Sequence, residues 1–226
     1  MTDKGPLHIA HRPSDFSTFV GNESTIQSLK SVLDREKGHV KVFLLQGPSG
    51  CGKTTLARII RNYLGCSEHD FFEYNMANTR GIDTIRGLVG NAKYAPLKGG
   101  VRIYLLDECH KLTTDAQNAL LKILEDTPDH VRFILCTTEP EKLINTIKTR
   151  CSTFQVSSLQ RAKIITLLKG VCEKEEAEFP DKHYKEIARV CDGSPRKALS
   201  ILDQIMDIPD DDKAFDAILS ATVSET

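Results

Sequence analysis

The sequence has little of what marks membrane-bound, secreted or disulfide-bonded proteins. No apolar run approaches the ~20 residues of a membrane-spanning helix, and the mean hydropathy is -0.28. The N-terminus has no basic segment followed by an apolar one, so we expect no secretory signal peptide. The seven cysteines are odd in number and never form a Cys-x-x-Cys pair. These absences argue against a disulfide framework or a closed zinc site, and they predict a cytoplasmic or, in a eukaryote, nuclear protein.

An excess of charge of one sign is also absent, since the net charge is -1. Any binding to nucleic acid must therefore come from a local arrangement of charge. Residues 79–102 provide one such place, because they hold one acidic residue and five basic ones: Arg80, Arg86, Lys93, Lys98 and Arg102. A solvated face and a DNA-facing surface both fit this surplus.

The pattern of apolar residues predicts an α/β domain followed by a helical one. Short apolar runs at 40–45, 71–74, 102–106, 131–136 and 153–156 read as strands, and they alternate with helical patterns at 22–37, 53–64 and 114–126. Such alternation is typical of a parallel sheet covered by helices on both faces. After residue 157 only helices are expected, at 159–172, 182–191, 195–206 and 210–220. We therefore predict an α/β domain over 1–157 and a helical lid domain over 158–226.

The strongest motif lies between the first predicted strand and the helix that follows it. Eight residues fit the pattern G-x-x-x-x-G-K-[ST] in full: Gly47, Pro48, Ser49, Gly50, Cys51, Gly52, Lys53 and Thr54. Glycines let the backbone wrap round a phosphate, whose charge the helix N-terminus and the backbone N–H groups stabilise. Lys53 is expected to reach the β- and γ-phosphates, and the Thr54 hydroxyl to bind Mg²⁺. An ordinary glycine-rich turn is the alternative, which pattern and context together disfavour.

A second motif follows the apolar strand at 103–106, where Asp107 and Glu108 stand side by side. Downstream of a P-loop this pair predicts a Walker B motif, in which Asp107 holds Mg²⁺ and Glu108 activates the attacking water. Cys109 and His110 could instead suggest a thiol–imidazole pair. Adjacent residues on a strand point to opposite faces, so that interpretation is weak.

Three further polar residues stand at positions where chemistry or mere structure would explain them. Thr138 follows a strand, where its hydroxyl could contact a γ-phosphate or cap the next turn. Arg196 lies in the first turn of a helix, where a cation opposes the helix dipole, and a bound phosphate would compensate. Arg150, a lone arginine before a short strand, means little without further context.

These motifs together resemble the AAA+ clamp-loader family, which includes replication factor C small subunits and bacterial DNA polymerase III gamma/tau subunits. The resemblance spans about residues 8–220. It is carried by the P-loop, by Asp107-Glu108 and by five further segments: 11–16 with 19–21, 75–86, Ala95-Pro96, 149–151 and 193–199.

The resemblance implies a role for each matched position. Arg12, Pro13 and Val20 would line the adenine pocket, and Thr55 would join the P-loop in binding ATP. Thr138 would be sensor 1 and Arg196 sensor 2, whereas Arg150 would be an arginine finger for a neighbouring subunit. Arg80 and Arg86 would meet DNA backbone phosphates.

It also implies a function: an ATPase that uses ATP and Mg²⁺, together with other clamp-loader subunits, to load a sliding clamp onto primer–template DNA. The segment around residues 94–97 would touch the clamp. The isolated chain would hydrolyse ATP slowly, and assembly would accelerate it.

Two departures from the family stand out. Only Cys66, with His69 nearby, lies where the bacterial subunits carry a zinc-binding cysteine cluster, so we expect no zinc. The sequence also stops where the family's helical collar would begin, so we expect either a truncated chain or a minimal loader.

Three alternatives remain open at this stage. Another AAA+ DNA machine, such as a helicase loader or a branch-migration motor, would share the ATP site but form a homo-hexamer. A non-hydrolysing scaffold would not need Lys53, Asp107 and Glu108 together. A small-molecule kinase or GTPase is disfavoured, because no Asn-Lys-x-Asp motif is present.

Overall fold

The computed structural model describes residues 5–35, 38–79 and 81–220. All five predicted strands form one parallel sheet in the order β2-β3-β4-β1-β5. The strands are β1 (Val42–Gln46), β2 (Phe71–Asn75), β3 (Arg102–Asp107), β4 (Val131–Thr137) and β5 (Ser152–Gln155). The prediction of a parallel α/β sheet is therefore confirmed. β1, β3 and β4 are almost entirely buried, which explains their continuous apolar runs.

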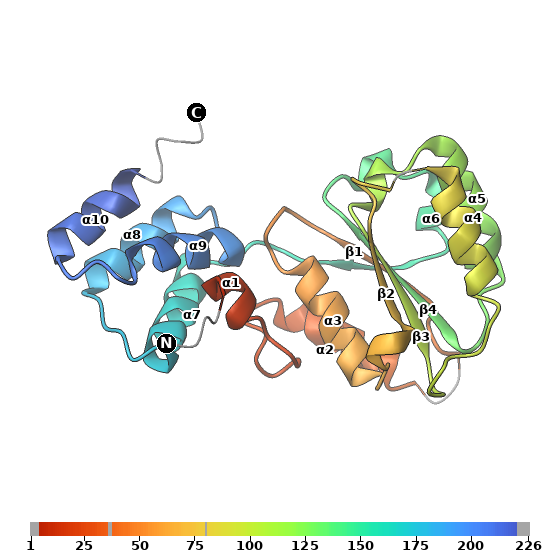
Figure 1. Cartoon of the computed structure of the whole chain (residues 1–226), viewed down its shortest axis with the longest axis horizontal. Helices are drawn as coiled ribbons and strands as arrows, with labels where there is room; N and C mark the ends of the chain where they lie inside the picture. Colours follow the sequence, from red (N-terminus) through yellow and green to blue (C-terminus); the bar gives the residue numbers. More distant parts are fainter. Residues whose placement is uncertain (1–4, 36–37, 80, 221–226) are drawn as a thin grey trace.

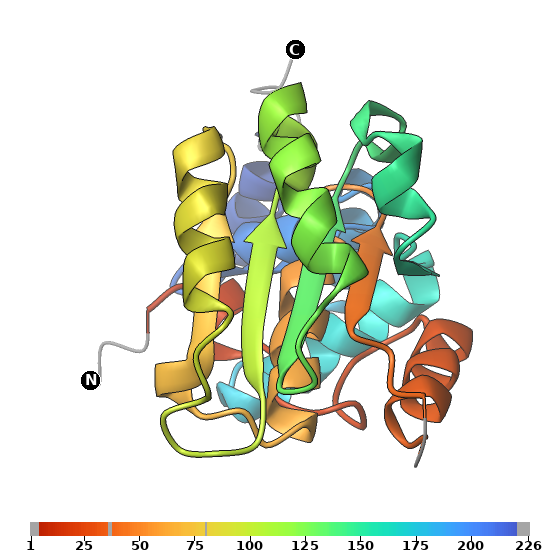
Figure 2. The same ribbon diagram turned by 90° about the vertical axis from the view of Figure 1, so that its right-hand side faces the viewer.

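Helices cover both faces of the sheet (Figures 1 and 2). On one face lie α2 (Glu23–Leu33) and α3 (Lys53–Tyr63), which enclose a core with Phe43, Leu45 and Ile134. On the other lie α4 (Ile82–Asn91), α5 (Thr114–Glu125) and the short α6 (Asn145–Lys148). Among the described residues, three 3₁₀ turns interrupt the connections: η1 (Glu68–Asp70), η2 (Cys109–Lys111) and η3 (Pro140–Lys142). The sheet thus packs against a separate apolar core on each of its two faces.

A second body of helices follows the sheet domain. It consists of α7 (Arg161–Lys174), α8 (Asp181–Val190), α9 (Pro195–Ile205) and α10 (Asp211–Ser220), which share a third apolar core. The sequence did not predict α1 (Leu7–Ala10), whose Leu7 side chain is buried in this core. Because the N-terminal segment packs on the helical lid and then returns to the sheet, it passes along the junction between them (Figure 1).

The register of the strands brings their polar ends to one edge of the sheet. Gln46 pairs with Thr137, and Asn75 pairs with Asp107. The P-loop follows β1 at this edge, so the two predicted motifs meet there. In open α/β sheets, ligands bind outside the carboxyl ends of the strands.

One residue of the predicted basic surface is not on the surface. Arg102 is 5% exposed, and its guanidinium contacts Asp70 at 3.1 Å. It also donates to the carbonyl oxygens of Asn91, Tyr94 and Ala95. Counting Arg102 toward a basic face was wrong, because a guanidinium that pairs with a buried carboxylate contributes packing rather than surface charge. The pair instead anchors the loop that follows α4.

Within the described ranges, no helix is both long and apolar enough to cross a membrane.

Candidate functional site

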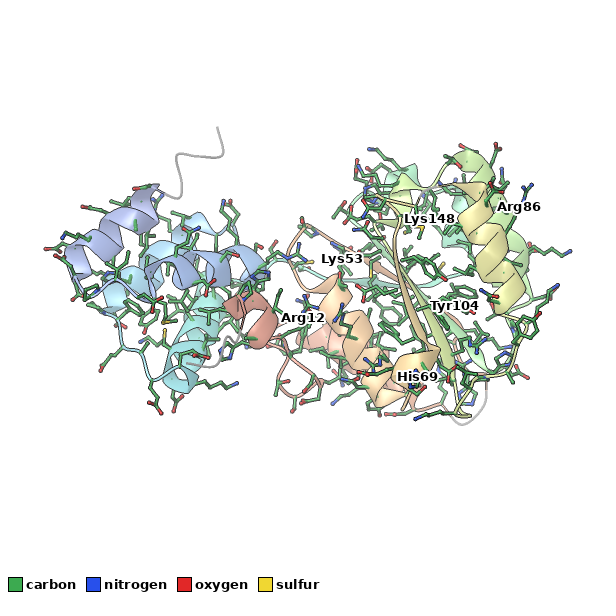
Figure 3. All side chains as sticks on the ribbon, viewed as in Figure 1. Arg12, Lys53, His69, Arg86, Tyr104 and Lys148 are labelled. Atoms are coloured by element: carbon green, nitrogen blue, oxygen red, sulfur yellow. The ribbon has the colours of Figure 1, made fainter. Side chains whose placement is uncertain are left out.

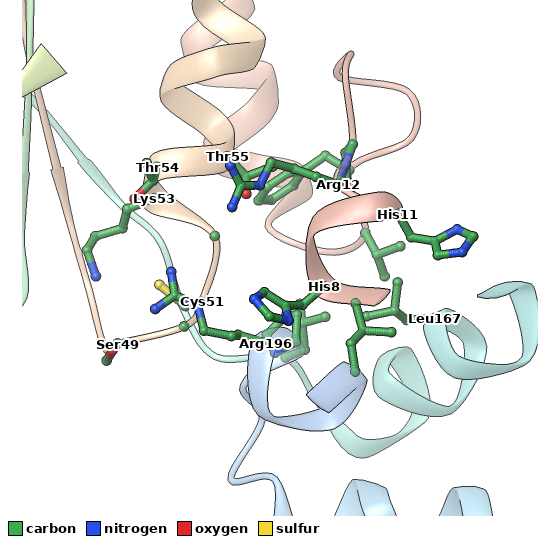
Figure 4. A pocket seen from close by; sticks show the side chains of 18 of the residues that line it. His8, His11, Arg12, Ser49, Cys51, Lys53, Thr54, Thr55, Leu167 and Arg196 are labelled. Atoms are coloured by element: carbon green, nitrogen blue, oxygen red, sulfur yellow. The ribbon is translucent and has the colours of Figure 1, made fainter. Parts of the chain in front are cut away.

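A cavity of about 260 Å³ lies at the junction of the sheet edge, the N-terminal segment and α9 (Figure 4). It brings together most of the residues that the sequence predicted: Arg12, Pro13, Val20, Ser49, Gly50, Cys51, Gly52, Lys53, Thr54, Thr55, Asp107, Glu108 and Arg196. Gly47 and Pro48 contribute backbone carbonyls just behind it. The chain thus builds one pocket from four stretches that are far apart in sequence.

Lys53 is folded back onto the P-loop. Its side chain is nearly buried, and its ammonium donates to the carbonyl oxygens of Gly47 and Pro48, both at 2.7 Å. Across the described part of the chain, no carboxylate forms an ion pair with it. A buried ammonium without a counter-ion favours an anionic ligand, because desolvation strengthens its attraction to negative charge.

Thr54 and Asp107 form the oxygen pair that a divalent cation would need. The Thr54 hydroxyl donates to Asp107 Oδ2 at 2.7 Å, and the Glu108 backbone N–H donates to Asp107 Oδ1 at 2.9 Å. Mg²⁺ prefers few protein oxygens and completes its shell with phosphate oxygens and water. The residues present therefore fit Mg²⁺ bound together with a nucleotide.

Glu108 occupies an unusual backbone position directly after β3. Its φ is 54° and its ψ is 39°, a left-handed conformation that is rare for residues other than glycine. The next three residues form η2 rather than a continued strand, so the strand geometry used to separate Cys109 from His110 was wrong. The two side chains still lie apart, since Cys109 is buried in the core and His110 faces carboxylates. Burial also raises the pKa of the Cys109 thiol, which disfavours a nucleophile.

The lid reaches the P-loop through the start of α9. Ser194 Oγ lies 3.4 Å from the Gly50 carbonyl oxygen, and a Cβ on Gly50 would meet that hydroxyl at 2.2 Å. Gly50 has φ +70°, so both the turn and the close approach require glycine here. This contact brings Arg196 into the pocket, where it points toward the same space as Arg12 (Figure 4).

The pocket is electropositive where Arg12 and Arg196 approach each other. Burial, then the nearby Arg58 guanidinium, lowers the pKa of Arg12, and Arg196 acts in the same direction, while Glu73 opposes them. The pocket lining therefore holds three cations, Arg12, Arg196 and Lys53. It holds two carboxylates, Asp107 and Glu108. Such an excess suits a polyanion that arrives with a divalent cation.

An apolar end of the pocket was largely missed from the sequence. Phe19, Leu159, Leu167 and Leu199 line it, as do His8 and His11. The leucines lie on or beside lid helices, where their spacing is that of ordinary core residues. Their role becomes visible only when the lid is placed against the sheet. An apolar wall beside a phosphate-binding loop suits the base of a nucleotide.

Three other predicted site residues lie outside this pocket, and one cannot be placed. Thr138 follows β4 and does not line the cavity. Arg86 lies on α4, far from Lys53 (Figure 3), is exposed, and contacts Asp83 at 3.3 Å. Arg80 lies outside the described residues. Arg150 lies two residues before β5, at the opposite edge of the sheet from the P-loop.

Arg150 is held by its own chain at that edge. It donates to the Thr146 carbonyl oxygen at 2.8 Å and forms an ion pair with Glu125. The groove around it is lined by residues that precede β1, β4 and β5. Since the P-loop follows the other end of β1, Arg150 lies away from the pocket of its own chain and does not line it.

Comparison with known proteins finds relatives among DNA polymerase III subunits. Residues 68–160 match the family described as DNA polymerase III, delta subunit. The DNA polymerase III subunit gamma/tau of Mycobacterium bovis is 35% identical over 224 residues, covering 88% of this chain and 38% of that protein. The tau subunit of Escherichia coli is 33% identical over 214 residues, covering 85% and 33%. The chain therefore spans less than half the length of these two relatives.

Solved structures share the fold. The Holliday junction branch migration motor RuvB of Thermotoga maritima superposes with a TM-score of 0.75 over 94% of this chain and 72% of that one. Its sequence identity is 23%, so the likeness concerns the fold alone. A sheet domain with a helical lid is thus a known arrangement, independent of what either protein acts on.

Proposed function

This chain belongs to the AAA+ clamp-loader family, with the DNA polymerase III gamma and tau subunits, and from that we propose that it is an ATPase subunit of a DNA sliding-clamp loader. ATP binding would order an assembly that opens the clamp and grips primer–template DNA, and hydrolysis would release the closed clamp. We also propose that it works in the cytoplasm.

The pocket residues divide the work of hydrolysis. The P-loop N–H groups and Lys53 would hold the phosphates, and Arg196 would tie the lid to the same nucleotide. Thr54 and Asp107 would hold Mg²⁺, which supplies charge neutralisation on the phosphates. Glu108, whose carboxylate lines the pocket, would accept a proton from the attacking water. Thr138 would act as sensor 1, with its hydroxyl in contact with the γ-phosphate.

The observation that carries the proposal is the placement of Arg150. It lies at the sheet edge opposite the P-loop, which supports a role in the pocket of a neighbouring subunit rather than in its own. In a spiral of subunits, an arginine at this edge would complete the site of its neighbour.

The proposed clamp-facing segment follows α4. Tyr94 and Leu97 are 68% and 75% exposed, among the most exposed large apolar side chains that the structure describes. Asp70 accepts from the N–H groups of Leu97 and Lys98, and Arg102 holds the preceding carbonyls, so the loop is fixed while its side chains remain free. A fixed apolar loop suits a protein partner, since little ordering remains to oppose binding.

Replacing Glu108 with glutamine tests the proposal. The amide keeps the shape but cannot accept a proton, so turnover should fall by ~10²–10⁴-fold while ATP binding persists. The stalled assembly should then be recovered from cells with ATP present and weighed by native mass spectrometry. We expect a hetero-oligomer that contains a distinct loader subunit or a ring-shaped clamp.

A homo-hexamer without a clamp would instead favour the branch-migration or helicase-loader alternative and leave the ATP site standing. Turnover at the wild-type rate would show that Glu108 is not the base. Asp115→Asn, which changes an exposed carboxylate on α5, is the matched control and should alter neither result.

Arg86→Ala should weaken DNA binding without changing sequence preference, because phosphate contacts carry no base information. The slope of log affinity against log salt should fall by about one unit for each lost phosphate contact. Fluorescence anisotropy with primer–template DNA measures both quantities. An unchanged slope would remove Arg86 from the DNA-facing surface. Lys163→Ala, a lysine that pairs with Glu23 on α2, serves as the control.

A further inference from the structure

A buried histidine faces Glu108 and a second carboxylate with one and the same ring nitrogen. The His110 side chain is 1% exposed, and its Nε2 lies 3.4 Å from Glu108 Oε2 and 3.0 Å from Glu139 Oε1. On the other side of the ring, Nδ1 lies 3.2 Å from Thr137 Oγ1. None of the motifs used to assign the ATP site accounts for this cluster.

The imidazole is fixed on two sides. Thr137 is fully buried at the end of β4, and its hydroxyl oxygen already accepts from the Glu139 N–H at 3.0 Å. Carboxylates only accept hydrogen bonds, so the ring meets Glu108 and Glu139 as a donor through Nε2–H. Glu139 is itself held, because its other oxygen pairs with Lys142 at 2.5 Å.

Glu108 is less constrained than its neighbours. Its side chain is 32% exposed, and its backbone has the left-handed conformation described above. A proton acceptor must hold its carboxylate in one place relative to the attacking water, since misplacement by about 1 Å can cost ~10²-fold in rate. A rigid ring donor within reach limits where that carboxylate can turn.

We propose that His110 is a positioning residue, held by Thr137 and Glu139, that sets the orientation of the Glu108 carboxylate for hydrolysis. This inference rests on the proposed ATPase function, in which Glu108 is the base. Thr137 fixes the ring from Nδ1, and the ring in turn orients Glu108 through Nε2, which follows the general logic by which one group orients the next in catalytic sites.

Two substitutions of His110 separate positioning from packing. The amide nitrogen of His110→Gln can take the place of Nε2, whereas that of His110→Asn takes the place of Nδ1 and leaves the carboxylates without a donor. In the assembled complex, we expect His110→Asn to lower kcat by about tenfold or more with KM and ATP affinity unchanged. His110→Gln should recover most of that loss.

A double-mutant comparison links the effect to Glu108. In the Glu108→Gln background, His110→Asn should cause no further loss of turnover, because the base it positions is already gone. If His110→Asn and His110→Gln lower kcat equally, and both also lower the melting temperature, then His110 has only a structural role and the proposal is overturned. Unchanged kcat in both variants would overturn it as well.

A readout that needs no hydrolysis distinguishes this inference from the proposed function. The full chain, labelled with ¹⁵N-histidine and without nucleotide, should show a His110 Nε2 resonance that moves on Glu108→Gln. Absence of any shift on Glu108→Gln would overturn the proposed contact. If wild-type complexes hydrolyse no ATP but the resonance moves, the ATPase proposal fails while the contact stands.

Discussion

Replacing Lys53 with alanine is expected to abolish ATP binding, with affinity reduced at least ~10²-fold. The ammonium is buried against the carbonyl oxygens of Gly47 and Pro48, so it is already desolvated before any ligand arrives. On binding it can exchange neutral carbonyls for phosphate oxygens, a gain that alanine cannot supply. Isothermal titration of the purified chain with ATP and Mg²⁺ measures the loss.

The same substitution should not unfold the protein. Removing the buried ammonium relieves a desolvation cost but leaves two carbonyl oxygens without their donor, so the melting temperature should change little. Lys41→Ala is a suitable control, because that lysine pairs with an exposed carboxylate on Asp129, remote from the pocket. ATP affinity within a few-fold of wild type would contradict the assignment of the P-loop.

Most of the sheet could be predicted because its strands are buried on both faces. The run from Val42 to Leu45 is apolar at every position and precedes a glycine-rich turn, a pattern that indicates a buried strand. Helix α1 was missed because four residues are too few for a periodic pattern, and its stability comes from burying Leu7 in the lid. Helix α4 has no counterpart among the helices predicted from apolar spacing.

The candidate site likewise combines residues that the sequence predicted with residues that it did not. Residues that act through their own backbone segment, such as Lys53 and Thr54, are fixed by a local motif and were predicted with their neighbours. Leu167 and His8 enter the pocket only because the lid and the N-terminal segment fold over it. The partner of Arg102 was likewise hidden, since Asp70 lies 32 residues away and nothing in a count of charges reveals the pair.

The placement of Arg150 also bears on how the proposed assembly would work. Its guanidinium and the P-loop occupy opposite edges of one rigid sheet, so a stack of subunits in a common orientation would bring each arginine to the next pocket. Before that, Glu125 holds it on its own chain. Assembly would therefore exchange an exposed ion pair, worth little in water, for a phosphate contact in a closed site.

Arg150→Ala should therefore leave ATP binding by the isolated chain unchanged and lower the turnover of the assembled complex by ~10³–10⁵-fold. Steady-state ATPase assays of isolated chain and complex measure the two effects. The isolated chain gives the internal control, because without a neighbour Arg150 has no pocket to act on. A comparable loss in both would mean that Arg150 matters for folding and not for a neighbouring site.

Mixing two defective subunits gives the decisive version of this test. A subunit with Arg150→Ala still has a complete pocket with Glu108. A subunit with Glu108→Gln still has Arg150. If Arg150 acts on the neighbour, mixed assemblies will contain interfaces where a complete pocket meets a complete arginine, and turnover will return at those interfaces. If Arg150 acts within its own subunit, no subunit in the mixture has both groups. Turnover will then stay at the level of the defective parents at every mixing ratio.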